Sequence, residues 1–147
     1  MNGSSGELFQ RGLELIEKGD CLAALSALEK SLAIDSGNAA CKSYIAFLKA
    51  TERGQLNTSI SELEELAAGA PNEPAVHLNL GKLYLRAGRK THAIETFRKG
   101  LACGKLPEAV KVLESLGLRK KPVFGFLPRD HFLNKYSGKL FKKLGLR

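Results

Sequence analysis

Apolar residues recur through the first hundred residues at the spacing of amphipathic helices, with glycines and polar segments between them. Three glycines, Gly19, Gly54 and Gly88, each follow one such segment, where the left-handed backbone that ends a helix costs glycine little. The pattern predicts six helices joined in pairs, and therefore an all-α chain. The predicted helices cover residues 6–18, 21–34, 39–52, 56–69, 74–87 and 90–103.

Polar residues at the predicted helix starts suggest how those helices are capped. Ser4 with Glu7, and Ser59 with Glu62, have the spacing of a capping box, in which each residue hydrogen-bonds the other's backbone. Asn72 is a candidate N-cap for the helix that begins near Pro74, since proline is tolerated in a first turn.

The helix pairs repeat with a nearly constant period. Small residues recur at Gly12, Ala46 and Gly81, spaced 34 and then 35 residues apart. Bulky apolar residues of the second helices recur with the same periods, at Leu28, Leu63 and Phe97. A small residue lets the facing helix approach closely, so each unit is predicted to be a tightly packed helical hairpin.

The third unit matches a known repeat most fully. Asn79-Leu80-Gly81-Lys82-Leu83-Tyr84 is followed by Gly88, Ala93 and Phe97. In order and spacing, these residues resemble the tetratricopeptide repeat family. The tryptophan column of that family is absent and is occupied by Leu8, Lys42 and His77. The resemblance implies a right-handed α-solenoid of three helical hairpins with a non-catalytic role in protein binding.

The domain organisation follows from the repeats. We expect a repeat domain over residues 5–118 and a C-terminal extension over 119–147. An amphipathic helix over 107–117 would cap the last repeat, because a solenoid needs its final apolar face covered. The three expected units are 5–38, 39–73 and 74–107.

In the family that the chain resembles, the first helices of the hairpins line a concave groove. The lining expected here is mostly apolar, and Lys82 is its only charge: Phe9, Leu13, Ile16, Ser43, Phe47, Ala50, Leu78, Lys82 and Leu85. Chaperone-docking members carry a Lys, Asn and Arg clamp at positions that here hold Phe9, Leu13, Tyr44, Ala75 and Asn79. We therefore expect an adaptor or scaffold that binds a helix or peptide of a protein partner, but not an acidic chaperone tail.

The sequence offers no catalytic or metal-binding pattern. Cys21, Cys41 and Cys103 form no CxxC pair, and we interpret them as small apolar residues in a reducing cytoplasm. Neither the three histidines nor any serine has the spacing of a metal site or a nucleophile. No apolar run is long enough to span a bilayer, and no secretory signal pattern is present. We expect no enzyme activity, cofactor or metal, and a cytoplasmic location.

Charge separates the two parts of the chain. The net charge is +8, but residues 1–118 hold 14 basic and 14 acidic residues, whereas 119–147 hold nine basic residues and one acidic residue. The extension could form an amphipathic helix over 130–144 with one apolar and basic face: Phe132, Leu133, Tyr136, Lys139, Leu140, Lys142 and Lys143.

The extension supports an alternative function that the sequence leaves open. The chain could bind an anionic membrane surface through lysines that flank apolar residues. It could also bind nucleic acid, which is the less favoured ligand, or the extension could pack against the repeats. The sequence does not indicate an oligomeric state.

Overall fold

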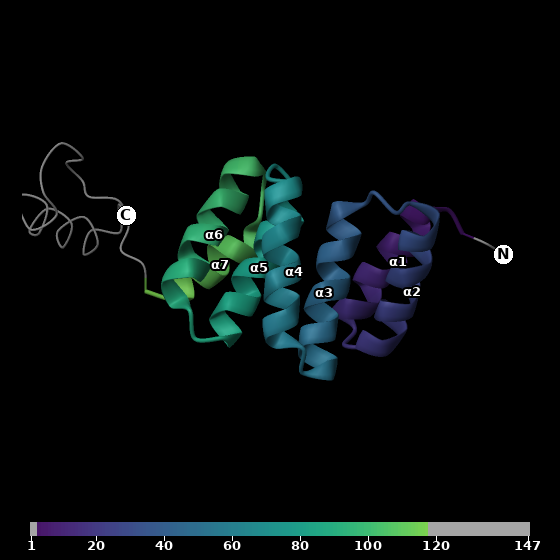
Figure 1. The fold of residues 1–147 in the computed structure, drawn as a ribbon, viewed down its shortest axis with the longest axis horizontal. Helices are drawn as coiled ribbons and strands as arrows, with labels where there is room; N and C mark the ends of the chain where they lie inside the picture. The colour runs from purple at the N-terminus through teal and green to yellow at the C-terminus, as the bar shows by residue number, and fades with distance from the viewer. Residues whose placement is uncertain (1–2, 118–147) are drawn as a thin grey trace, which may run out of the picture. The chain divides into compact units, whose positions relative to one another are not determined.

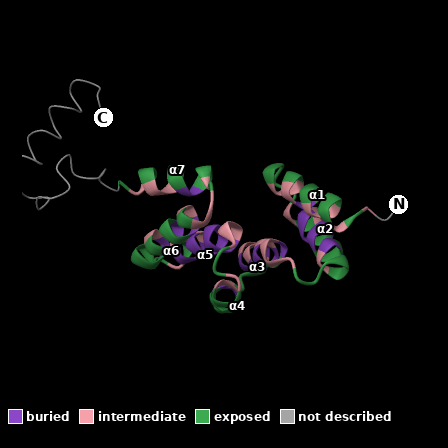
Figure 2. Cartoon of the chain, turned by 90° about the horizontal axis from the view of Figure 1, so that it is seen from above, coloured by how far each residue is buried: buried purple, intermediate pink, exposed green. Residues whose placement is uncertain are grey.

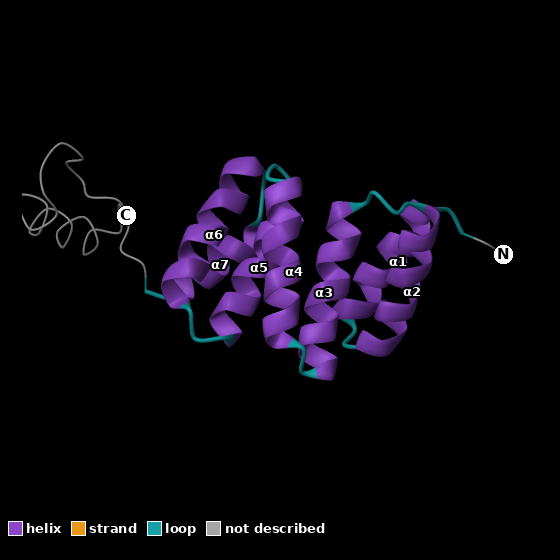
Figure 3. Ribbon diagram, in the orientation of Figure 1, coloured by secondary structure: helices purple, strands orange, loops and turns teal. Residues whose placement is uncertain are grey.

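The computed structural model describes residues 3–117, and this part of the chain contains α-helices and no strands (Figures 1 and 3). Residues up to Leu113 form one compact unit, to which all the contacts below belong. The helices are α1 Ser5–Glu17, α2 Cys21–Ile34, α3 Ala39–Arg53, α4 Leu56–Gly69, α5 Pro74–Arg86, α6 Lys90–Cys103 and α7 Pro107–Ser115.

The six paired helices begin and end within one residue of the predicted ranges, so the prediction of an all-α fold is confirmed over the described residues. The three turn glycines have φ of 80°, 66° and 74°, the left-handed conformation on which the prediction relied. The extension 119–147, with the helix predicted over 130–144 and its apolar and basic face, lies outside the described residues.

The capping predictions had mixed outcomes. Ser4 and Glu7 form the capping box: the Glu7 amide donates to Ser4 Oγ at 3.2 Å and the Ser4 amide to Glu7 Oε2 at 2.9 Å. The Ser59 capping box is wrong, because α4 begins three residues earlier and Ser59 is buried inside it. Asn72 is also not the N-cap of α5, since Glu73 takes that position and its carboxylate accepts from the Ala75 amide.

Each hairpin is closed by a small residue that faces a bulky one. A Cβ added to Gly12 would lie 2.6 Å from Leu28, and one added to Gly81 would lie 2.6 Å from Phe97. Both bulky side chains are fully buried. In the middle hairpin the small residue is Ala46, and α3 contacts α4 less extensively than the other helices contact their partners. The glycines therefore permit the closest helix packing.

The second and third hairpins stack through their first helices, and the first hairpin contacts the second mainly through α2. α3 packs against α5, while α2 contacts α3 and α4 contacts α5. In Figure 2, α4 lies on one side of α3 and α5, and α1 and α7 lie on the other. Phe47 of α3 packs against both of the hydrophobic clusters that form the core. The stacking leaves side chains of α1, α3 and α5 on one face, which we call the first-helix face.

Tyr84 of α5 connects the third hairpin to α4 of the second hairpin. Its hydroxyl donates a hydrogen bond to Glu64 Oε1 at 2.6 Å, and its ring contacts His92 at 5.4 Å between centroids. Burial and the bond to the Glu64 carboxylate raise the pKa of Tyr84 to about 12. The phenol therefore keeps its proton, and with it this hydrogen bond, well above the ordinary pKa of tyrosine.

Substitution of Gly81 by alanine tests the close packing of α5 and α6. We expect Gly81→Ala to lower the free energy of unfolding by about 1–3 kcal/mol, because the added Cβ would force the fully buried Phe97 ring to shift. Urea unfolding of this variant and of Gly6→Ala measures the effect. Gly6 lies in α1 with nothing within 4 Å of an added Cβ, so its replacement should stabilise slightly. Equal effects at both positions would contradict the proposed close packing.

The Tyr84 hydrogen bond predicts a pH dependence of stability. Between pH 10 and about 12 the unfolded state loses the tyrosine proton while the folded state keeps it. The unfolded state then binds fewer protons, so stability falls as pH rises. We expect Tyr84→Phe to be less stable than the parent by about 1–2 kcal/mol at pH 8. That gap should narrow between pH 10 and 12, as measured by urea unfolding. A gap independent of pH would contradict the raised pKa.

Candidate functional site

The first-helix face holds the residues that the sequence predicted as a groove lining, but at two depths. Six of the nine are partly exposed: Phe9, Leu13, Ile16, Phe47, Lys82 and Leu85. Ser43, Ala50 and Leu78 are buried below them. The partly exposed members come from all three first helices, so the face extends across the whole stack. The buried members contribute to helix packing and are not available to a ligand in this conformation.

Two aromatic rings join the first and second units on this face. The rings of Phe9 and Tyr44 meet edge to face, with centroids 6.1 Å apart and planes at 61°. Burial raises the pKa of Tyr44, and the carboxylates of Glu108 and Glu73 raise it further. Both effects disfavour the charged phenolate of Tyr44.

A buried polar contact joins the second and third units. The Asn79 side-chain amide donates to Ser43 Oγ at 2.9 Å, and that hydroxyl donates to the carbonyl of Ala40 at 2.7 Å. The buried Asn79 Oδ1 has no hydrogen-bond partner. An unpaired buried acceptor lowers stability. The Asn79–Ser43 hydrogen bond, by contrast, favours the one register of α3 against α5 in which the two side chains meet.

Lys82 connects α5 to both of its neighbours on this face. Its Nζ lies 5.2 Å from the centre of the Phe47 ring on α3, within the range of a cation–π contact. The same atom is 2.5 Å from Glu108 Oε1 on α7. Lys82 is thus neutralised by a carboxylate from the last described helix.

Tyr44 and Glu108 contribute to this face although the sequence did not predict them in the groove lining. Tyr44 follows Ser43, the residue that the 34-residue period makes equivalent to Phe9, so the repeat period gave no signal for the Phe9–Tyr44 pair. Glu108 had no such signal either, because it belongs to α7, outside the three repeats. Its position depends on how Leu106 and Ala109 pack against the core.

The remaining chemistry in the described residues is structural. His77 is buried, and its Nε2 lies 2.7 Å from the Pro71 carbonyl. A carbonyl can only accept, so Nε2 carries the proton. Cys41 is also buried, its Sγ donates to the Leu28 carbonyl, and burial raises its pKa, which disfavours the reactive thiolate.

Two other kinds of site are absent from residues 3–117. No group of three or more His, Cys, Asp and Glu side chains in this range is placed to hold a metal ion. No helix there is long and apolar enough to cross a membrane.

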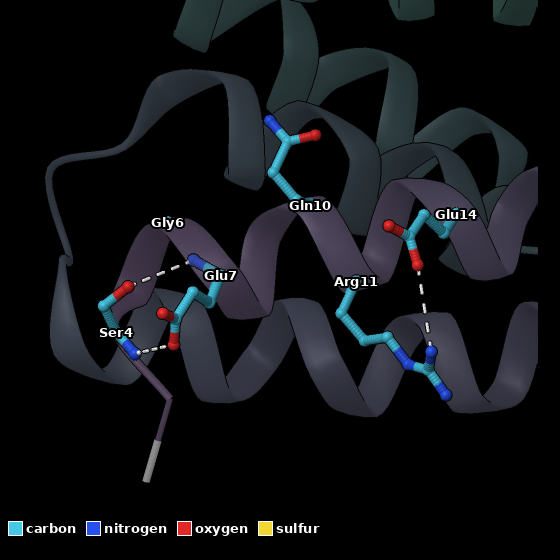
Figure 4. Close-up of a pocket in the computed structure, with 6 residues that line it drawn as sticks. All are labelled: Ser4, Gly6, Glu7, Gln10, Arg11 and Glu14. Atoms are coloured by element: carbon cyan, nitrogen blue, oxygen red, sulfur yellow. Dashed lines mark hydrogen bonds and ion pairs between the residues drawn. The ribbon is translucent and has the colours of Figure 1, made fainter.

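A shallow depression runs along α1 (Figure 4). Its side chains are largely satisfied by neighbours on the same helix: Ser4 bonds Glu7, and Arg11 Nη1 lies 3.8 Å from Glu14 Oε2. No buried polar atom points into it, so it offers little to a small ligand. The depression is lined by Ser4, Gly6, Glu7, Gln10, Arg11 and Glu14.

Comparisons with known proteins agree with this architecture. The family model of the tetratricopeptide repeat matches residues 74–102. No curated protein matches the chain. Among solved structures, one crystal structure of MamA superposes with a TM-score of 0.50 at 18% identity, covering 82% of this chain and 62% of that one.

A second crystal structure of MamA gives a TM-score of 0.53 at 17% identity, covering 97% of this chain and 70% of that one. At such low identity the likeness concerns the fold. Together, these comparisons show one tetratricopeptide repeat at residues 74–102 and a fold for the chain that is similar to that of MamA.

Proposed function

We propose that this protein is a non-catalytic adaptor that binds a helix or extended peptide of a protein partner on its first-helix face. The repeat type and the solenoid fold support an interaction scaffold in general. The observation that carries the more specific proposal is the row of partly exposed apolar side chains that crosses all three first helices, among them Phe9, Leu13 and Phe47. A reducing, cytoplasmic location is consistent with the free cysteines of the described chain.

Leu13 is the best position at which to test this proposal. It is partly exposed on α1 and is not part of either hydrophobic cluster, so a change there should not disturb the fold. Leu22 on α2 provides a matched control, because 72% of it is exposed and it lies on a second helix. The same substitution at both positions adds one charge and removes one leucine, so the two variants differ mainly in which helix carries the change.

We expect Leu13→Glu to abolish binding of a partner protein and Leu22→Glu to preserve it. Burying a carboxylate between the apolar face and a partner would cost much free energy, because the charge would lose its water. Affinity capture from a cytoplasmic extract with the full chain and both variants, quantified by mass spectrometry, makes the comparison. Circular dichroism verifies that both variants stay helical. Partners that are retained by Leu13→Glu, or lost equally with Leu22→Glu, would contradict the proposed face.

A further inference from the structure

Lys82 is the only charged residue among the nine predicted lining residues, and its surroundings indicate what a partner needs. The Lys82 side chain is 22% exposed, whereas that of its ion-pair partner Glu108 is 56% exposed. The Lys82 side chain is therefore mostly covered, with its ammonium over the Phe47 ring, and its ion-pair partner is the more exposed of the two. A partner that covers Phe47 would also remove water from Lys82.

An ammonium group has three N–H donors. Glu108 Oε1 accepts from one side, and the Phe47 ring covers another. On the open face, solvent can satisfy the remaining donor, because 22% of the Lys82 side chain is exposed. Once a bound segment displaces that water, the donor needs an acceptor from the segment, because an unpaired buried donor on a charged group is costly. A carboxylate is the strongest acceptor available to a peptide.

Building on the proposed function, we propose that Lys82 determines specificity and that the partner segment is apolar with one Asp or Glu side chain, whose carboxylate accepts a hydrogen bond from Lys82. The segment is apolar because most of the lining around Lys82 is apolar. Lys82 is also not at any of the five positions of the chaperone-tail clamp, so we do not expect the carboxylate to come from an acidic C-terminus. The carboxylates of Glu108 and Glu73, which lie near Tyr44, would instead attract a basic side chain. Selection of a basic segment is therefore the competing outcome.

Selection from a phage-displayed library of short random peptides tests the proposal even though the partner is unidentified. The full chain, Lys82→Met and Lys99→Met serve as targets. Methionine keeps the lysine stem over Phe47 but removes the charge, and Lys99 is an exposed lysine on α6 that controls for the change in net charge. We expect the parent and Lys99→Met to enrich apolar peptides with a common acidic residue, and Lys82→Met to lose that residue from its consensus.

A selected peptide is then measured against the parent chain by fluorescence anisotropy, together with its Glu→Gln or Asp→Asn counterpart. We expect the amide version to bind about tenfold more weakly to the parent and equally well to Lys82→Met. Failure to enrich any peptide would overturn the proposed function itself. Enrichment without an acidic residue, with a basic one, or with an acidic preference that persists in Lys82→Met would overturn only the role of Lys82.

Discussion

The close approach of two helices at Gly12, and again at Gly81, is the constraint on which the rest of the structure depends. At each site a fully buried bulky side chain, Leu28 or Phe97, occupies the space that a Cβ would need. This contact fixes how the first and third hairpins close. With its second helix held in this way, each of these hairpins packs against the middle hairpin, through α2 against α3 and through α5 against α3 and α4.

The joints between units differ, although the repeats that they join are alike. Phe9 meets Tyr44 through an aromatic contact at the first joint, whereas Asn79 meets Ser43 through a buried hydrogen bond at the second. The aromatic contact stabilises the first joint. The buried hydrogen bond at the second joint restricts the register of α3 against α5, at some cost in stability. Phe47 packs against both core clusters and also beneath Lys82. One side chain thus connects the core to the face that we propose binds a partner.

Local sequence patterns predicted the helices well because their causes are local. Glycine turns and small-residue columns act within one hairpin, and Gly19, Gly54 and Gly88 adopt the predicted conformation. The capping box at Ser59 was wrong because its spacing occurs by chance within a helix that begins earlier. Side-chain depth was harder to predict: Ser43 shares a predicted face with Phe47 but is buried, where it accepts a hydrogen bond from Asn79 of the next hairpin.

The pairing of Lys82 with Glu108 could not be predicted because it joins a repeat to a helix outside the repeat pattern. Periodicity relates equivalent positions in successive units, and α7 has no equivalent among them. The depth of Lys82 against Phe47 likewise follows from tertiary packing. These contacts carry the selectivity that we propose, and they are the contacts that sequence patterns reveal least.

If the first-helix face is the binding surface, a partner must contact the first helices and leave the second helices free. Backbone amide NMR of the full chain, titrated with a bound partner peptide, distinguishes the two sets of helices residue by residue. We expect the largest shift changes in α1, α3 and α5, around Leu13, Phe47 and Lys82. Changes concentrated in α2, α4 and α6 would contradict binding on the first-helix face.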